Sequence, residues 1–307
     1  MTNIKKGIIV NIDSHESVVY DQNDKTYANC LAKGNIKRNS KESPLVGDYV
    51  TFDVIANDKG YITKIEPRKN EIHRPKMANI DQIFIVSALK EPNLNTYIID
   101  KYIAFLELNK IEPILLFTKP DLVTDKNDSV WQIIDDYKKM DYQVFVIDNK
   151  KPNKEILDSL EKIMVNKISL FTGQTGAGKT STLNNFLSFE DQQKTNEISQ
   201  ALNRGKHTTT KVTLYVINDN IYLADSPGFS SFTLKGISLD QIRYAFRAFE
   251  KYQGECKFND CVHLNEKQCK IKEEVKEKNI PQFLYDDYVK MIEEVKKEEE
   301  TPWKNTF

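Results

Sequence analysis

The strongest chemical pattern in this chain is a glycine-rich stretch in its second half. It runs Gly173-Gln174-Thr175-Gly176-Ala177-Gly178-Lys179-Thr180 and matches G-x-x-x-x-G-K-[ST] in full. The segment KISLF before it is typical of a strand, and KTSTLNNFL after it is typical of a helix. In such a loop the backbone N–H groups face phosphate oxygens, Lys179 contacts the β- and γ-phosphates, and the Thr180 hydroxyl binds Mg²⁺. The sequence therefore predicts a nucleoside-triphosphate site.

Two tetrapeptides at predicted strand ends favour GTP as the nucleotide. Asp225-Ser226-Pro227-Gly228 follows IYLA, where a nucleoside triphosphatase holds Mg²⁺ through a carboxylate and places a glycine near the γ-phosphate. Thr118-Lys119-Pro120-Asp121 follows PILLF. A carboxylate there can accept two hydrogen bonds from guanine, whereas adenine lacks that pair of donors. An ATP-dependent phosphotransferase stays open as an alternative.

A cluster of three cysteines and one histidine lies near the C-terminus. The set Cys256, Cys261, His263 and Cys269 has the composition of a tetrahedral structural Zn²⁺ site, with no position left for a catalytic water. Reduced free thiols in a helical tail are the alternative. Cys30 lies far from this cluster and is expected to be a buried strand residue.

Composition limits the kinds of protein that can carry these sites. The chain has 307 residues, 39% of them apolar, and 44 Lys+Arg against 45 Asp+Glu, which fits a folded multidomain chain rather than a disordered one. No apolar run approaches the length of a membrane span, and the N-terminus lacks a signal-peptide core, so we expect a cytoplasmic protein with no membrane partner. A net charge of −1 confines nucleic-acid contact to local patches.

Hydrophobic periodicity divides the chain into three predicted domains. Residues 1–70 show short alternating runs that predict a small β-barrel, OB-like in preference to SH3-like. Residues 71–230 alternate strands with helices and predict an α/β P-loop domain with a mostly parallel sheet. Residues 231–307 predict a helical zinc-binding domain, with FTLKGISLDQIRYAFRAFEKY helical and a long helix over about 282–300.

The order of the motifs indicates a circular permutation, because the guanine-contact segment at 118–121 precedes the P-loop at 173. With a barrel in front and a Cys₃His module behind, the chain resembles the circularly permuted ribosome-assembly GTPases of the RsgA (YjeQ) type over essentially its whole length. The resemblance rests on LVGDYV, TKPD, GQTGAGKTS, the run Gly205-Lys206-His207-Thr208-Thr209-Thr210, DSPGF and the Cys₃His set. It implies GTP hydrolysis stimulated by the small ribosomal subunit and a role in late subunit maturation.

The resemblance also implies roles for single residues. Thr209 would sense Mg²⁺ and the γ-phosphate, and Ser181 would complete the P-loop. His207 would position the attacking water or stabilise charge, with an exposed RNA-contacting histidine as the equal alternative. Phe229 stands where many GTPases have a water-orienting Gln, so we expect slow hydrolysis by the isolated chain and acceleration by a macromolecular partner.

Four departures from the family pattern are visible. Thr118 replaces the usual Asn, Lys206 replaces the usual Arg, and Thr180 stands where Ser is common. No clear Ser-Ala element follows the strand-like YQVFVID, which leaves the fifth guanine contact unassigned.

The predicted partners are the small ribosomal subunit and its rRNA, bound by a monomer. A GTP-gated regulator of a non-ribosomal protein is the alternative. The basic residues considered for RNA contact in the barrel are Lys33, Lys37, Arg38, Lys41, Arg68, Lys69, Arg74 and Lys76. Those in the C-terminal domain are Arg243, Arg247, Lys251, Lys257, Lys267, Lys270 and Lys272.

Overall fold

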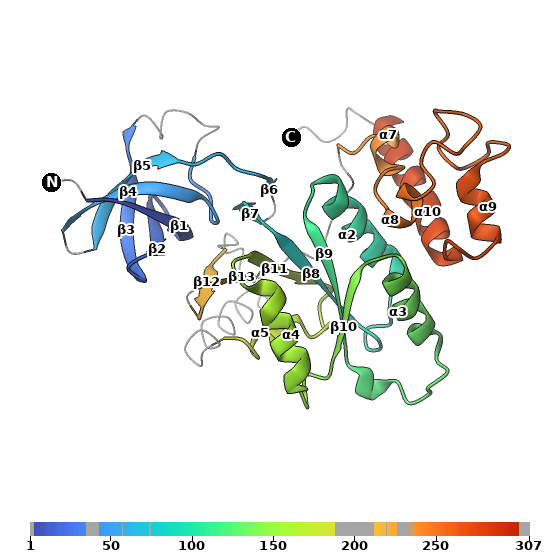
Figure 1. Cartoon of the computed structure of the whole chain (residues 1–307), viewed down its shortest axis with the longest axis horizontal. Coiled ribbons are helices and arrows are strands. Elements are labelled where there is room, and N and C mark those ends of the chain that lie inside the picture. Colours follow the sequence, from blue (N-terminus) through green and yellow to red (C-terminus); the bar gives the residue numbers. More distant parts are fainter. Residues whose placement is uncertain are drawn as a thin grey trace. The chain divides into compact units, whose positions relative to one another are not determined.

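The structure, a computed structural model, describes residues 3–34, 43–56, 58–73, 75–187, 212–218, 220–225, 234 and 236–300 (Figure 1). Two compact units make up the chain, and each combines two separate stretches of sequence. Unit 1 consists of residues 1–84 and 149–230, and unit 2 consists of residues 85–148 and 231–307.

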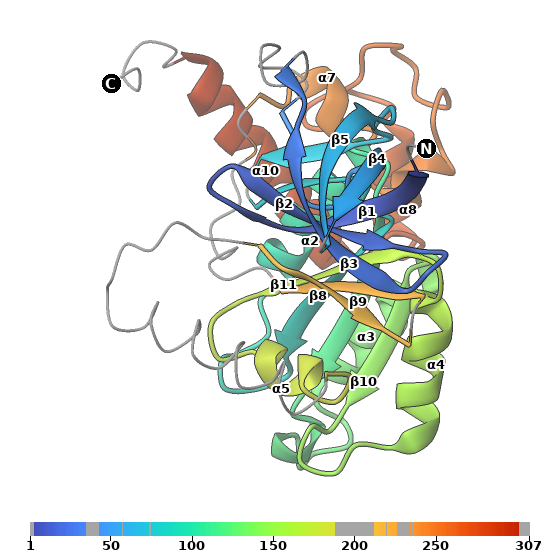
Figure 2. The ribbon, with the colours of Figure 1, turned by 90° about the vertical axis from the view of Figure 1, so that its left-hand side faces the viewer.

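Unit 1 begins with a closed five-stranded barrel, whose strands are drawn in shades of blue in Figure 2. The strand order is β1-β2-β3-β5-β4, closed by an antiparallel β1–β4 pair and containing one parallel pair, β3–β5. This arrangement confirms the predicted barrel and its OB-like form. The strands are β1 (Asn3–Asp13), β2 (Glu16–Asp21), β3 (Thr26–Ala32), β4 (Tyr49–Ala56) and β5 (Lys59–Ile65).

Alternation of side chains along these strands fills the barrel. Ile9, Cys30, Phe52 and Ile62 are fully buried in one apolar cluster. Burial raises the pKa of the Cys30 thiol to about 11, so this cysteine is an inert core residue, as its isolated position predicts.

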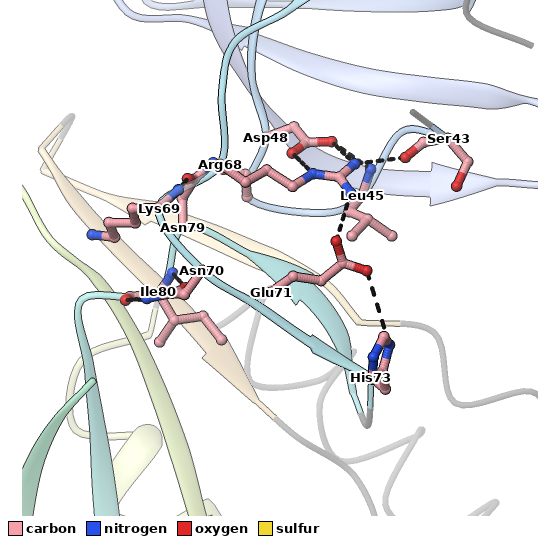
Figure 3. Close-up of polar contacts among 11 residues, drawn as sticks. Ser43, Leu45, Asp48, Arg68, Lys69, Asn70, Glu71, His73, Asn79 and Ile80 are labelled. Carbon is pink, nitrogen blue, oxygen red and sulfur yellow. Dashed lines mark hydrogen bonds and ion pairs between the residues drawn. The ribbon is translucent and has the colours of Figure 1, made fainter. Parts of the chain in front are cut away.

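A buried ion pair connects the barrel to the segment that follows it (Figure 3). Asp48 has no solvent exposure, and Arg68 donates to its two oxygens, from Nε at 2.7 Å and from Nη2 at 2.8 Å. The same guanidinium donates to the Ser43 carbonyl at 2.6 Å and to Glu71 at 2.8 Å. Removing one member of such a pair leaves a buried charge uncompensated, at a cost of about 3–5 kcal/mol. Arg68 therefore has a structural role at this point of the fold, whereas its contact with RNA stays a prediction.

The junction between the barrel and the segment after it also includes the LVGDYV stretch, residues 45–50, which contains Asp48. Gly47 has φ +91°, and a Cβ there would lie 2.2 Å from the Ala78 carbonyl oxygen, so only glycine fits. Asn79 donates to the Gly47 carbonyl at 3.0 Å and accepts from the Lys69 N–H at 2.9 Å. The junction includes a small hairpin of β6 (Glu71–His73) and β7 (Lys76–Ala78).

A six-stranded sheet with order β10-β9-β8-β11-β13-β12 forms the centre of the fold. The pairs β10–β9 and β11–β13 are parallel and β12–β13 is antiparallel, which confirms a mostly parallel α/β sheet. The strands are β8 (Gln82–Ala88), β9 (Glu112–Thr118), β10 (Gln143–Ile147), β11 (Ile168–Gly173), β12 (Leu214–Ile217) and β13 (Ile221–Asp225). The connecting helices are α2 (Thr96–Leu108), η2 (Pro120–Leu122), α3 (Ser129–Lys139), α4 (Lys154–Met164) and α5 (Lys179–Leu183).

The C-terminal part of unit 2 is helical. It contains α7 (Leu239–Ile242), α8 (Arg247–Glu250), α9 (Lys270–Lys276) and α10 (Gln282–Glu300). The expectation of one helical stretch before the cysteines was wrong in part: Ser238 begins α7 with a capping box, and extended backbone at Phe246 separates α7 from α8. Among the described residues, no helix combines the length and the apolar character needed to cross a membrane.

Arg247 fastens this helical part to the rest of unit 2. Its guanidinium lies 2.7 Å from both the Glu107 and Glu112 carboxylates and stacks on the Tyr142 ring at 4.8 Å. Glu112 is the first residue of β9. Arg247, like Arg68, therefore has a structural role, and its contact with RNA stays a prediction.

A buried pair of carboxyl groups lies where α10 packs on α2. Asp100 on α2 and Asp287 on α10 are both buried. The Tyr137 hydroxyl donates to Asp100 at 2.7 Å, and Lys290 donates to Asp287 at 2.7 Å. The Oδ2 atoms of both carboxyls are buried and have no donor among the described residues. Burial raises the pKa of Asp100 well above its ordinary value, which favours the neutral acid.

This pair predicts a pH-dependent stability. Because the folded pKa of Asp100 lies above the unfolded one, the folded state holds more protons, and stability falls as pH rises between the two values, by at most about 1.4 kcal/mol per pH unit. Asp100→Asn should still accept from the Tyr137 hydroxyl but cannot ionise, so it should remove this slope. Urea unfolding between pH 5 and 8 measures it.

The matched control is Asp135→Asn, an exposed carboxylate on α3 that pairs only with Lys138 at 3.1 Å in the contacts described. It should keep the wild-type slope. The other charged or titratable groups around the pair, Tyr97, Lys101, Tyr142 and Glu294, are unchanged in both variants. Equal slopes in wild type and Asp100→Asn would contradict the raised pKa of Asp100.

Candidate functional site

The glycine-rich loop connects the end of β11 to the start of α5, both in unit 1. Gly176 has φ +80° and Gly178 has φ +88°, a backbone region that side chains with a Cβ rarely adopt. Ala177 is fully buried, and its N–H donates to the Gln174 carbonyl at 3.1 Å, which closes the turn. Lys179 and Thr180 then occupy the first turn of α5.

The helix after the loop is shorter than the sequence predicts. It ends at Leu183, and the chain continues in tighter turns in which Asn185 N–H donates to the Thr182 carbonyl at 3.1 Å. Asn184 and Asn185 are poor helix formers because their side chains compete for backbone hydrogen bonds.

Asp225 lies at the carboxyl end of β13, next to the strand that leads into the loop. In the parallel β11–β13 pair, Phe171 lies opposite Asp225. Phe171 is two residues before Gly173, the residue at which the P-loop begins. The structure thus brings the backbone of Asp225, the first residue of the DSPG segment, close to the start of the P-loop. Ser226, Pro227 and Phe229 lie outside the described residues. The residues predicted for the switches, His207, Thr209 and Gly228, lie outside the described residues.

The guanine-contact candidate lies at the carboxyl end of β9 in unit 2. Thr118 is fully buried, and its carbonyl accepts from the Leu89 N–H at 3.0 Å. Lys119 has φ +56°, and its ammonium donates to the Glu91 carbonyl. This turn leaves Asp121 exposed in the short helix η2.

Asn149 is a site residue that no motif indicates. It lies two residues after β10, and its Nδ2 donates to the Thr182 hydroxyl at 2.9 Å. Its Oδ1 accepts from Asn185 Nδ2 at 3.1 Å. A single Asn after a strand gives no signal in the sequence, because only the fold brings it to the helix behind the P-loop.

The Cys₃His set converges in the C-terminal part of unit 2. One ligand atom from each of Cys256, Cys261, His263 and Cys269 lies within 4.8 Å of the others. His263 Nδ1 lies 3.6 Å from the Cys256 sulfur and 3.4 Å from the Cys269 sulfur, and those sulfurs are 3.9 Å apart. Zinc–sulfur bonds of about 2.3 Å in a tetrahedron place sulfurs about 3.8 Å apart, so the donor set fits Zn²⁺.

The surroundings hold this cluster in place. Tyr285 donates to the His263 carbonyl at 2.7 Å, and Tyr288 donates to the Val262 carbonyl at 2.8 Å, both from α10. The Lys270 N–H points at the Cys256 sulfur at 3.4 Å, a contact that favours a thiolate. Burial lowers the pKa of His263, which favours the neutral imidazole that metals bind.

Glu266 organises the loop between the ligands. Although burial disfavours its charged form, backbone N–H groups hold the pKa of its carboxyl below the usual value. Two of these donors are Val262 at 2.9 Å and Leu264 at 2.7 Å. The same loop exposes Lys257 and Lys267, whereas Lys270 pairs with Glu274 at 2.6 Å and Lys272 donates to the Leu264 carbonyl at 2.8 Å.

An OB-like barrel, a P-loop on a mostly parallel sheet and a guanine-contact segment that precedes the P-loop in sequence define a circularly permuted GTPase. The family model described as RsgA GTPase matches residues 65–235, and the one described as RsgA N-terminal domain matches residues 6–62. The chain belongs to the RsgA GTPase family, and it is an enzyme that hydrolyses GTP.

Individual relatives agree with this assignment. A protein of Mesomycoplasma hyopneumoniae (strain 7448) named "Small ribosomal subunit biogenesis GTPase RsgA" is 42% identical over 286 residues, which cover 92% of this chain and 96% of the relative. A Bacillus subtilis (strain 168) protein of the same name is 36% identical over 269 residues, which cover 87% of this chain and 89% of the relative. The crystal structure of YloQ, a circularly permuted GTPase, has a TM-score of 0.79 at 29% identity, with 99% and 98% coverage. YjeQ from Thermotoga maritima has a TM-score of 0.80 at 29% identity, with 95% and 98% coverage.

Proposed function

We propose that this GTPase acts in the biogenesis of the small ribosomal subunit, where it binds rRNA and couples GTP hydrolysis to late maturation and to its own release. The observation that carries the proposal is the 42% identity, over 92% of this chain, to a protein named for that process. Phe229 at the usual water-orienting position supports a site that a partner must complete. The proposal describes a cytoplasmic monomer with three functional domains, 1–70, 71–230 and 231–307.

Within this proposal, the P-loop binds the phosphates of GTP. The backbone of Gly173–Gly178 cradles them, Lys179 neutralises charge at the β- and γ-oxygens, and Ser181 completes the loop. Thr180, Asp225 and Thr209 serve the Mg²⁺ that accompanies the nucleotide, and Gly228 lies near the γ-phosphate. His207 orients water or stabilises developing charge.

Partner stimulation gives the most direct test. GTP hydrolysis by the full chain should be slow alone and rise by at least about 100-fold with purified small ribosomal subunits, because a completed water-positioning site supplies a large share of GTPase rates. His207→Ala should lose most of the stimulation, and His73→Ala, an exposed histidine on β6, should keep it. Hydrolysis that subunits leave unchanged would contradict the proposal.

Guanine selectivity is proposed to rest on Asp121, with Thr118, Lys119 and Pro120 forming its turn. Asp121→Ala removes an acceptor for two guanine donors, and the preference for GTP over ATP should fall by about 100-fold or more. Competition binding measures it. Asp125→Ala removes a nearby exposed carboxylate that accepts only from the Asn127 N–H, at 2.8 Å, in the contacts described, and should leave selectivity intact. An Asp121→Ala protein that still prefers GTP would place base recognition elsewhere.

We further propose that Cys256, Cys261, His263 and Cys269 hold one structural Zn²⁺. The purified chain should contain one zinc per molecule, and Cys269→Ser should lose it together with several kcal/mol of stability in the C-terminal part, because structural zinc contributes directly to folding. Cys30→Ser, in the barrel core, should retain the metal. A zinc-free chain with an unchanged thermal midpoint would rule the site out.

We propose that rRNA contacts basic residues with exposed side chains in two places, the barrel with its β6–β7 hairpin and the helical C-terminal part. Lys76 lies on the β6–β7 hairpin, and Lys257 and Lys267 lie on the loop of the Cys₃His cluster. Lys257 Nζ lies 5.7 Å from the ring centre of Phe258, a side chain that is 44% exposed. An exposed ring beside a lysine suits stacking with an unpaired base.

A further inference from the structure

Asn149 is the first residue of the second stretch of unit 1. Its side chain is hydrogen-bonded to Thr182 on α5, the helix that follows the P-loop. Its side chain is half-buried and faces the turn of α5 that runs from Gly178 to Thr182. Lys179 and Thr180, the two P-loop side chains that contact phosphate and Mg²⁺, lie within that turn.

The side-chain amide of Asn149 contacts the Thr182 hydroxyl through both its nitrogen and its oxygen. The Thr182 N–H donates to the Gly178 carbonyl at 2.9 Å, and the Thr182 hydroxyl reaches the same oxygen at 3.1 Å. A hydroxyl has one proton, which here has two acceptors within reach: the Gly178 carbonyl at 3.1 Å and Asn149 Oδ1 at 3.2 Å. With either acceptor, the hydroxyl oxygen accepts from Asn149 Nδ2 at 2.9 Å. Asn149 Nδ2 also lies 3.4 Å from the Gly178 carbonyl, and its Oδ1 accepts from Asn185 at 3.1 Å. Asn149 therefore acts as donor and acceptor together.

Such support matters because α5 is only five residues long. A helix of this length is marginal by itself, since few of its backbone groups find partners within it. A neighbouring side chain that binds both ends of the first turn supplies what the short helix lacks.

We propose that Asn149 is a positioning residue for the nucleotide: by fastening Thr182 and Gly178, it holds the turn that aims Lys179 and Thr180 at the phosphates. It touches no reacting atom and acts on bound GTP and GDP alike. Its loss should weaken ground-state and transition-state binding equally, which raises KM and leaves kcat nearly unchanged.

The test is nucleotide release from the full chain, followed with fluorescent GDP and with a fluorescent non-hydrolysable GTP analogue. Asn149→Ala should speed dissociation of both by the same factor, about tenfold, as expected for the loss of hydrogen bonds that organise a binding loop. Thr182→Val should do the same. The double variant should be no faster than either single one, because both remove one chain of hydrogen bonds.

Two further variants separate positioning from general stability. Asn153→Ala removes an Asn hydrogen bond from the same loop, where the side chain caps α4 by accepting from the Glu155 N–H at 2.8 Å. It should lower the thermal midpoint without changing nucleotide release. Asn149→Asp keeps the acceptor and loses the donor, and should behave like Asn149→Ala.

Wild-type release rates in Asn149→Ala would overturn the proposal, as would additive effects in the double variant. Wild-type behaviour of Asn149→Asp would overturn the role of Asn149 Nδ2 as the donor that fastens Thr182. The measurement uses no ribosomal subunit, so its outcome is independent of the proposed partner.

Discussion

The ion pair between Asp48 and Arg68 is the constraint from which the architecture of unit 1 follows. A carboxylate with no solvent exposure must have a charged partner, and Arg68 provides it from the segment after the barrel. From there a continuous series of contacts runs through Asn79 and the β6–β7 hairpin to Asp81, whose carboxylate accepts from the Ile168 N–H at 2.8 Å. Ile168 begins β11, the strand that ends in the P-loop. The barrel is thereby tied to the base of the strand that presents the phosphate-binding loop.

Unit 2 repeats this arrangement with a different arginine. Arg247 belongs to the C-terminal helices and pairs with Glu112 at the start of β9, and β9 ends in the Thr118–Asp121 segment. Arg68 is connected to the start of β11 only through the series of contacts that ends at Asp81, whereas Arg247 pairs directly with the first residue of β9. Under the proposed function, RNA bound beside either arginine would act on the loop at the other end of the same strand.

Local patterns in the sequence predicted the features that depend on neighbouring residues. The P-loop, the strand–helix alternation and the Cys₃His ligands all lie within short stretches, so composition and spacing reveal them. Long-range partners decide the rest. Arg68 was grouped with the RNA candidates because its partner Asp48 lies 20 residues away, and Arg247 because Glu107 lies more than 100 residues away. The same reason hides Asn149, whose meaning depends on Thr182 on another element, and the break between α7 and α8, where tertiary packing overrides helical periodicity.

The division of each unit into two stretches of chain sets the order in which the protein can form during its own synthesis. The barrel is continuous from β1 to β5 and can close as soon as those strands have left the ribosome. Neither unit can be completed so early: unit 1 waits for residues 149–230, and unit 2 waits for residues 231–307. Until residues 168–173 have been made, β8 lacks its neighbour β11 in the sheet, although α2 can already pack on β9. We expect the unpaired edge of β8 to be the part of the nascent chain most open to wrong pairing.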